Sequence, residues 1–341
     1  MRAARLTRKE HIEILDLPVP DIAADEALVR VIAYGPYGTD VGHYLDRDDR
    51  YVDDYPIGIG ADFSGIVAKI GAAVTNVTVG DRVSALALAH CGKCANCTRG
   101  KTNLCLDYSF YMGDRQICCQ EFTVVPARKL AKLPDNVTFD DGAMLAGVVE
   151  TLNGFEMMGV KPGDTMAIVG VGAMGLAAVG TAVALGLDVV AFGGRGARAT
   201  LAKNLGARAV IPLKSYDENI APAALALSPG GYKYVFESTV TQWGMKLAFA
   251  IAALEARVAL TGGGQVPING WDITQKELRI IGVRAGHHQA QAHALIAPGK
   301  LDLKPTIGAR FPLEHADDAF KLLASPKAAD IGRVIIDVGT P

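Results

Sequence analysis

Two patterns of hydrophobic and polar positions divide the chain. Up to about residue 155, short runs rich in Val and Ile alternate with turns of Gly, Pro and Asp. Examples are ALVRVIAYG at 27–35, GIVAKIG at 65–71 and DRVSAL at 81–86. Short apolar runs bounded by turn residues predict β-strands, so we expect a β-rich domain here.

From Lys161 onward, strand-like and helical segments alternate. Apolar runs such as TMAIVG at 165–170 and DVVAFG at 188–193 are followed by Ala- and Leu-rich stretches, of which 173–186 is the first. This βαβ order predicts a parallel, doubly wound sheet in a chain of the α/β class. The tail predicts a helix at 314–325 and then a strand at 332–338.

Residues 167–187 carry no charge and are long enough to span a bilayer, so a membrane helix is an alternative. The stretch opens with a β-type run and is then broken by Gly170, Gly172 and Gly175. A buried strand, a glycine turn and a buried helix explain that order better.

The length, charge and cysteine content of the chain limit the classes of protein to which it can belong. A chain of 341 residues with 50% hydrophobic and 21% charged residues predicts a globular protein of two domains. A net charge of -2 without basic runs argues against a nucleic acid or membrane partner. The N-terminus lacks a signal-peptide core, so we expect a cytoplasmic protein, where cysteines stay reduced. Four of the six cysteines lie within 91–105, which favours a metal site over disulfides.

The glycine motif follows a predicted strand and opens a predicted helix. In Gly170-Val-Gly172-Ala173-Met174-Gly175, the first glycine makes the tight turn and the second lets the backbone approach a pyrophosphate. The third permits close packing of strand and helix, and the helix N-terminus faces the anion. The motif predicts dinucleotide binding, and the alternative is a glycine turn without a ligand.

The end of the next strand favours NADP(H) over NAD(H). An NAD site normally places Asp or Glu there, whereas this chain has Gly193, Gly194 and Arg195. Two glycines leave room for a 2′-phosphate, and an arginine offers a charged, forked donor. Lys214 is a candidate second cation. Alternatively, Arg195 begins a solvated turn and Gly193 tolerates either cofactor.

At this point the chain resembles a medium-chain dehydrogenase/reductase of the zinc-containing alcohol dehydrogenase type over essentially all of its residues. The matching motifs are YGPYGTDVGH at 34–43, PIGIGADFSGIVAKIGAAVTNVTVGDRV at 56–83, the cysteine loop, GVKPGDTMAIVGVGAMG at 159–175 and LRIIGV at 278–283. The resemblance implies a GroES-like catalytic domain at 1–155 and 291–341, with an inserted Rossmann domain at 156–290. It also implies cofactor contacts from Val283 and Arg284, and a homodimer or homotetramer.

This family holds a structural zinc in a four-cysteine lobe, here at about 90–107. Its spacing, C-x2-C-x2-C-x7-C, is matched by Cys91, Cys94, Cys97 and Cys105. Four thiolates close the coordination sphere and leave no position for substrate, so this zinc is expected to be structural. The alternative is four reduced thiols without metal.

The positions that hold the catalytic zinc in the family are altered. The family's cysteine is Tyr37, its His-Glu pair is Ala61-Asp62, and its junction ligand falls on or next to Ala146. We therefore expect no catalytic zinc, since Tyr and Ala do not assemble a zinc shell. A rearranged metal site is the alternative, with ligands drawn from Asp62, Asp40, His43 and Glu150.

Without zinc, another group must handle the proton. The candidates are Tyr37, Thr39, Asp62 and Glu150, whose positions the resemblance directs to the cleft. We expect reversible NADP(H)-dependent reduction of a ketone or aldehyde, with a carbonyl or alcohol as the small-molecule partner. Reduction of an activated C=C bond and nucleotide binding without turnover remain alternatives.

Overall fold

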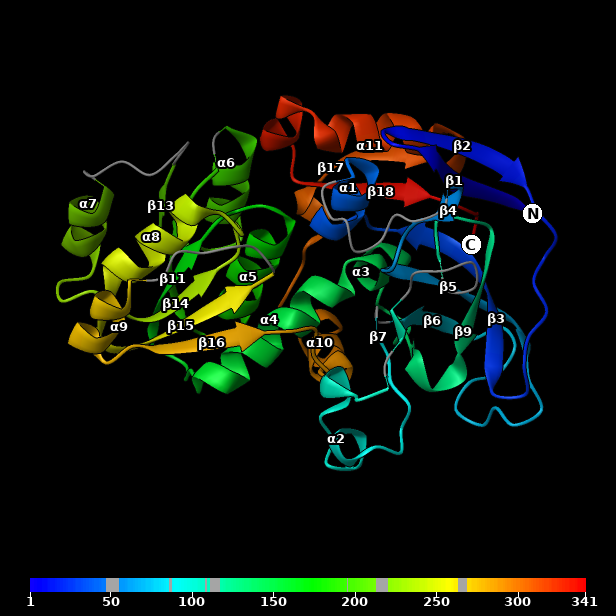
Figure 1. Cartoon of the computed structure of the whole chain (residues 1–341), viewed down its shortest axis with the longest axis horizontal. Helices are drawn as coiled ribbons and strands as arrows, with labels where there is room; N and C mark the ends of the chain where they lie inside the picture. Colours follow the sequence, from blue (N-terminus) through cyan, green and yellow to red (C-terminus); the bar gives the residue numbers. More distant parts are fainter. Residues whose placement is uncertain are drawn as a thin grey trace. The chain divides into compact units, whose positions relative to one another are not determined.

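The computed structural model describes residues 1–46, 55–85, 88–107, 109–110, 117–194, 196–212, 220–262 and 269–341. The chain divides into two compact units. Unit 1 comprises Met1–Ala146 and Ile307–Pro341, and unit 2 comprises Gly147–Thr306 (Figure 1). The first boundary lies earlier than the expected 155/156, and the second lies later than the expected 290/291.

Packing explains both shifts. Helix α4 (Leu145–Met158) buries Phe155 and Met158 in the core of unit 2. The segment after residue 290 also remains with unit 2, because Leu301 and Leu303 pack against Gly180. A boundary at an exposed linker can be recognised in a sequence from its polar composition. Here the first boundary falls within helix α4, so the sequence carries no such signal.

Unit 1 is β-rich, as the alternating pattern predicted. Its larger sheet has the order β10-β6-β5-β3-β18-β17, with β9 also paired to β3, and a smaller sheet has the order β2-β1-β4. The strands are β1 (Arg2–Arg8), β2 (His11–Asp16), β3 (Glu26–Tyr34), β4 (Ile57–Gly58), β5 (Phe63–Ile70), β6 (Arg82–Ala85), β9 (Phe122–Pro126), β10 (Leu130–Lys132), β17 (Ile307–Pro312) and β18 (Arg333–Asp337). The helices are α1 (Gly38–Tyr44), α3 (Phe139–Ala143), α11 (Ala316–Ala324) and the 3-10 turns η2 (Ala127–Lys129), η4 (Leu313–His315) and η5 (Pro326–Asp330).

The C-terminal segment completes the larger sheet of unit 1. Strand β18 pairs antiparallel with β3 through Ile336 and Tyr34, and β17 pairs parallel with β18. The predicted tail helix and strand correspond to α11 and β18, whereas β17 was not predicted. Both ends of the chain therefore build one β-rich unit.

A small lobe leaves the sheets of unit 1 and carries the clustered cysteines. It contains β7 (Leu88–Ala89), α2 (Ala95–Thr98), η1 (Thr102–Leu104) and β8 (Ser109–Phe110), with β7 and β8 paired antiparallel. In Figure 1 the cyan lobe around α2 extends away from the strands of its own unit.

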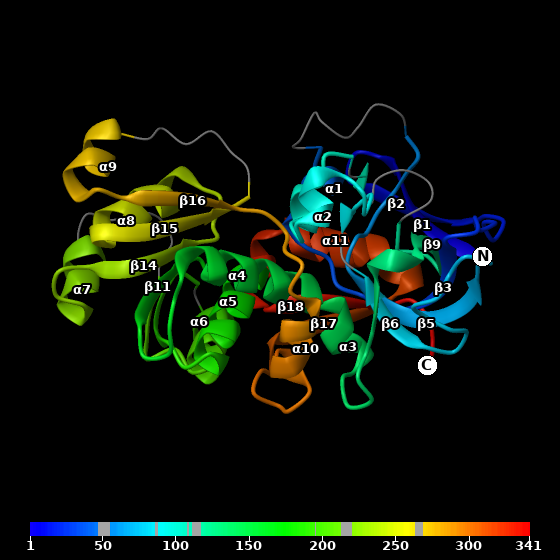
Figure 2. The same ribbon diagram turned by 90° about the horizontal axis from the view of Figure 1, so that it is seen from below.

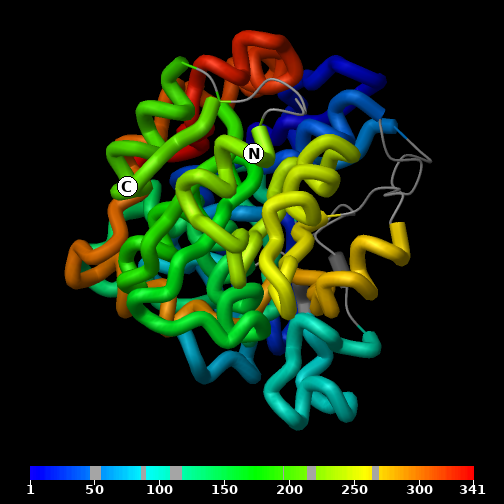
Figure 3. Tube along the Cα trace, turned by 90° about the vertical axis from the view of Figure 1, so that its left-hand side faces the viewer, coloured from blue at the N-terminus to red at the C-terminus, as the bar shows by residue number. Residues whose placement is uncertain are grey.

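Unit 2 is a doubly wound parallel sheet in the order β13-β12-β11-β14-β15-β16. Its elements are β11 (Thr165–Val169), α5 (Ala173–Ala184), β12 (Asp188–Phe192), α6 (Ala197–Asn204), β13 (Ala209–Ile211), α7 (Ile220–Leu227), β14 (Tyr232–Glu237), α8 (Gln242–Ile251), β15 (Ala252–Thr261), α9 (Gly270–Lys276), β16 (Arg279–Val283), α10 (Gln289–Ile296) and the 3-10 turn η3 (Lys304–Thr306). One core lies under α4, α5 and α6, and another lies under α7 and α8 on the opposite face (Figure 2). Figure 3 views this unit from the end at which α7 and α9 lie in Figure 1.

The uncharged stretch 167–187 is a strand end, a turn and a helix, namely the end of β11 followed by α5. None of the helices in the described part of the chain has the length and apolarity that crossing a bilayer requires. The predicted α/β class, with a β-rich domain and an inserted parallel sheet, is confirmed.

Candidate active site

The glycine loop joins β11 to α5, and its three glycines have different surroundings. Gly170 has a φ of +98°, and a Cβ there would lie 2.8 Å from Ser238 Oγ. A Cβ on Gly175 would lie 1.9 Å from Gly170 O, so only glycine allows this approach of helix to loop. A Cβ on Gly172 would meet nothing within 4 Å. Gly172 is also the N-cap of α5, so open space adjoins the helix N-terminus, where anions bind.

The end of β12 lies against this loop. The Gly170 N–H donates to Phe192 O at 2.6 Å, and a Cβ on Gly193 would lie 3.3 Å from Gly170 Cα. Gly193 and Gly194 have φ angles of +127° and +69°, which favour glycine. Neither residue carries the carboxylate that would repel a 2′-phosphate. Arg195 and Lys214 lie outside the described residues.

The other predicted cofactor residues lie in unit 2. Ala173 and Met174 begin α5, and Met174 Sδ lies 3.9 Å from Thr151 Oγ1. Val283 ends β16 and is buried. Arg284 follows it, and its carbonyl accepts a hydrogen bond from Asn153 Nδ2 at 2.7 Å. Because the strands are parallel, the carboxyl ends of β11, β12 and β16 all lie on the same side of the sheet.

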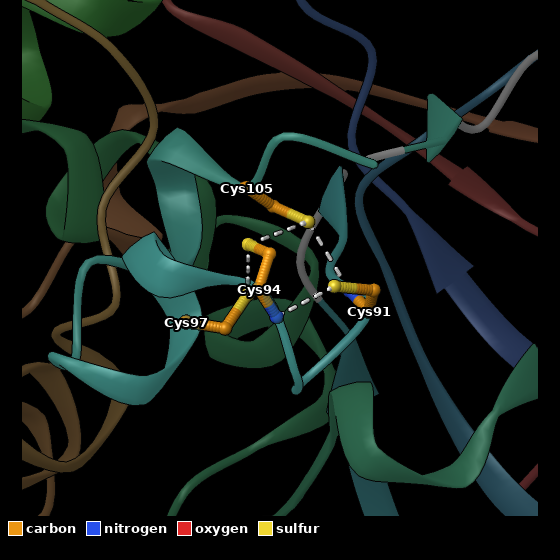
Figure 4. Close-up of side chains that lie close together, drawn as sticks. All are labelled: Cys91, Cys94, Cys97 and Cys105. Carbon is orange, nitrogen blue, oxygen red and sulfur yellow. Dashed lines mark hydrogen bonds between the residues drawn. The ribbon is translucent and has the colours of Figure 1, made fainter.

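The four predicted zinc ligands converge in the lobe of unit 1 (Figure 4). The sulfurs of Cys91, Cys94, Cys97 and Cys105 all lie within 4.8 Å of one another. Cys94 Sγ is 3.5 Å from Cys97 Sγ and 3.9 Å from Cys105 Sγ. None of the four forms a disulfide. This geometry fits a tetrahedral zinc site with four thiolate ligands.

Backbone amides around the lobe stabilise negative charge on these sulfurs. The Cys94 N–H donates to Cys91 Sγ at 3.3 Å, and the Cys91 N–H donates to Cys105 Sγ at 3.2 Å. Hydrogen bonds from the backbone N–H groups of Leu106 and Cys97 lower the pKa of Cys94 to about 6. Because a thiol must lose its proton to bind zinc, these donors favour metal binding.

Tyr37, which takes the place of a cysteine, has structural partners within unit 1. It is the N-cap of α1, and its backbone N–H donates to Asp40 Oδ2 at 2.8 Å. Its hydroxyl donates to Met144 O at 3.2 Å. The guanidinium of the buried Arg333 lies 4.5 Å from the ring centroid, which is a cation–π arrangement. Arg333 reaches this ring from β18, so the C-terminal segment contributes to the site.

The remaining candidate proton carriers have different environments. Thr39 is exposed on α1, whereas Asp62 is buried directly before β5. Glu150 lies on α4, and burial raises its pKa to about 7. A carboxyl group with that pKa exchanges protons readily at neutral pH.

A buried charged cluster in unit 1 was missed by the sequence analysis. Lys129, from η2, is 3% exposed, and burial lowers its pKa well below the usual range while the charge of nearby Asp62 opposes that shift. Asp40 is also buried, and burial raises its pKa to about 6 although the Tyr37 backbone N–H donates to its carboxylate. Cys118 and Cys119 line this cluster as buried thiols. Lysine in a polar turn is normally solvated, so its sequence context carried no signal.

Within unit 1, Asp40, His43 and Asp62 belong to no group of three or more metal-ligating residues in the described part of the chain. Two groups of metal-ligating residues occur there: the four cysteines, and Glu156 with His287 and His288. Neither group includes Asp40, Asp62 or Glu150. His43 is likewise outside both groups and is buried in α1.

Comparisons with known proteins agree with this architecture. The chain matches the alcohol dehydrogenase GroES-like domain over residues 23–135 and the zinc-binding dehydrogenase family over residues 173–297. The alcohol dehydrogenase of Geobacillus stearothermophilus is 31% identical, with 99% of this chain and 100% of that protein covered. The L-threonine 3-dehydrogenase of Bacillus subtilis (strain 168) is 30% identical, with 95% and 94% covered. A solved zinc-binding dehydrogenase of Sinorhizobium meliloti 1021, bound to NADP, superposes with a TM-score of 0.86 at 27% identity, over 99% of both chains.

The fold and these matches define an oxidoreductase of the dehydrogenase class. The chain belongs to the medium-chain dehydrogenase/reductase family, in its zinc-type alcohol dehydrogenase branch. The resemblance drawn from the sequence motifs is therefore confirmed.

Proposed function

We propose that this protein is an NADP(H)-dependent oxidoreductase that transfers hydride reversibly to a ketone or aldehyde without a catalytic zinc. The observation that carries the proposal is the set of side chains at the family's ligand positions. The Tyr37 hydroxyl donates a hydrogen bond to Met144 O, and Arg333 packs on the Tyr37 ring. Ala61 and Ala146 have no side-chain atoms that bind a metal. The four cysteines would hold one zinc as a structural ion, because four thiolates leave no coordination position open.

The preference for NADP(H) is supported by the end of β12. When bound, the dinucleotide supplies the hydride, and Gly172 at the N-cap of α5 leaves room for its pyrophosphate. Gly193 and Gly194 leave space without a carboxylate, and Arg195 would pair with the 2′-phosphate. The NADP-bound relative from Sinorhizobium meliloti has the same overall fold.

Among the candidate proton carriers, Glu150 is our proposed donor. Its pKa of about 7 lets it donate a proton and be reprotonated near neutral pH. The Tyr37 hydroxyl already donates to a backbone carbonyl, and Asp62 is buried beside Lys129 in unit 1. Tyr37, Asp62 and Thr39 remain the residues to test beside it.

The activity is tested by following NADPH oxidation with a panel of ketones, aldehydes and enones, using protein treated with a chelator that spares the cysteine site. We expect turnover of ketones or aldehydes that survives this treatment. Activity confined to enones would favour C=C reduction, and no activity with any substrate would favour a nucleotide-binding protein. Loss of activity on chelation, restored by added zinc, would refute the absence of a catalytic metal.

The donor is tested with Glu150→Gln, which keeps the shape of the side chain. We expect turnover to fall roughly a hundredfold while NADPH affinity is unchanged. Glu255→Gln, at an exposed glutamate on β15 of the same unit, is the matched control and should keep parental turnover. Parental turnover in Glu150→Gln, with a large loss in Tyr37→Phe or Asp62→Asn, would assign the donor to unit 1 instead.

We also propose that the protein is cytoplasmic and forms a homodimer or homotetramer, as the family resemblance implies. Light scattering or analytical ultracentrifugation measures the oligomeric state directly. A monomer at micromolar concentration would contradict it.

A further inference from the structure

A second group of metal-ligating side chains lies in unit 2, apart from the glycine loop and the cysteine lobe. It comprises Glu156 on α4 and the adjacent His287 and His288, which precede α10. One ligand atom from each residue lies within 4.8 Å of the others. The two imidazole rings lie side by side, with centroids 4.5 Å apart and planes tilted by 32°. Neighbouring histidines thus face the same carboxylate.

The backbone around this group is already positioned. The segment after β16 is held against α4 because Asn153 Nδ2 donates to Arg284 O at 2.7 Å. Gly286 packs so tightly on α4 that a Cβ would lie 2.8 Å from Val149 O and from Asn153 Cβ. The histidines are therefore held beside α4 by contacts that do not involve the carboxylate. Metal sites with such prepositioned ligands need little further ordering to bind.

The ring of His288 is buried and lies against the carboxylate of Glu156. The His288 side chain is 4% exposed, and its Nε2 lies 2.5 Å from Glu156 Oε2, which is within hydrogen-bonding distance. Its Nδ1 is buried and has no hydrogen-bond partner in the described part of the chain. When Nε2 gives its lone pair to a cation, the neutral ring can carry its proton on Nδ1. Glu156 would then coordinate the cation instead of accepting the proton.

We propose that Glu156, His287 and His288 form a binding site for a divalent transition-metal cation of the zinc type. Two imidazoles and one carboxylate suit such ions, and they leave one position for water. The bound ion would join the segment after β16 to α4. This site is separate from the four thiolates, and the proposal does not depend on the proposed activity.

The full-length protein carrying its tightly bound zinc is titrated with Zn²⁺ by calorimetry and with Co²⁺ by absorption spectroscopy. We expect one further ion per chain, with Co²⁺ bands that lack thiolate charge transfer. Binding should strengthen as pH rises, since the imidazoles must be unprotonated. Added Zn²⁺ should also raise the melting temperature, because the folded form alone presents the site.

Variants assign the site. His288→Ala should abolish the additional binding, and the more conservative Glu156→Gln should weaken it at least about tenfold without unfolding the chain. His315→Ala is the matched control, because His315 pairs with Asp318 at 2.9 Å in unit 1 but has no second imidazole. This control should bind the additional ion normally.

Two results would overturn the proposal. One is the absence of additional binding by the parental chain at millimolar Zn²⁺. The other is unchanged affinity in folded Glu156→Gln and His287→Ala. Additional binding that disappears in Asp62→Asn but persists in His288→Ala would place the ion in unit 1. That result would also contradict a dismantled catalytic zinc site, whereas loss confined to the histidine variants leaves the proposed activity untouched.

Discussion

Alanine substitutions at Gly172 and Gly175, in the loop between β11 and α5, should have different effects. Gly175→Ala should lower stability, whereas Gly172→Ala should lower the affinity for the cofactor. In Gly175→Ala, the new Cβ would lie 1.9 Å from Gly170 O, and both groups belong to backbone. Real Cβ contacts are essentially never below 3.0 Å, so α5 must move by about 1 Å or more relative to the loop. In Gly172→Ala, the Cβ would enter open space at a φ of -74°, which alanine adopts freely.

The magnitudes follow from these contacts. Forcing a group into packed structure costs roughly 1 to 3 kcal/mol, partly offset at Gly175 by alanine's better helix propensity. For a unit of this size, each kcal/mol lowers the melting temperature by about 2 to 4 °C. Gly172→Ala should change stability by less than about 0.5 kcal/mol. Its methyl group would meet the pyrophosphate, so affinity should fall at least tenfold, or about 1.4 kcal/mol.

Tryptophan fluorescence in urea measures the stability of the correct unit, because both tryptophans, Trp243 and Trp271, lie in unit 2. NADPH titration measures affinity for each folded variant. Parental stability of Gly175→Ala would refute the packing role of the third glycine. Unchanged NADPH affinity of Gly172→Ala would show that the pyrophosphate binds elsewhere.

Four further predictions concern the same chain. Carbonyl reduction should slow as pH rises through about 7, where Glu150 loses its proton, and alcohol oxidation should quicken; a pH profile without that transition would exclude this donor. Cys97→Ser should lose the tightly bound zinc and unfold at lower temperature, as elemental analysis and calorimetry would detect, and metal loss at unchanged stability would contradict a structural role. Asp40 has a pKa raised to about 6, so its ionisation costs stability as pH rises from 4 to 8; Asp40→Asn should gain up to about 3 kcal/mol relative to the parent over that range in urea unfolding, and a constant difference would count against the shift. NADPH should bind at least about tenfold more tightly than NADH, and Arg195→Ala should remove most of that difference; equal affinities in the parent would disprove the preference.

The sequence by itself determined the features that depend on local spacing. Gly170, Gly172 and Gly175 lie within one turn, and Cys91 to Cys105 lie within one loop, so neighbouring residues settle their geometry. The alternation of strands and helices predicted the parallel sheet for the same reason, because each βαβ unit is local. The motifs spread along the chain then identified the family and, through it, the two-unit architecture.

Only the tertiary structure decided which distant residues meet. Arg333 stacks on Tyr37 from the opposite end of the chain, Lys129 lies near Asp62, and His288 reaches Glu156 across 132 positions. The domain boundaries belong here too, since buried Phe155 and Leu301 assign their segments to unit 2. Charged residues such as Lys129 are solvated in most sequences with this pattern, because burying a charge is costly without a partner. A partner supplied by another strand or helix leaves no periodic trace in the sequence, so burial, shifted pKa values and long-range ligand sets appear only once the chain is folded.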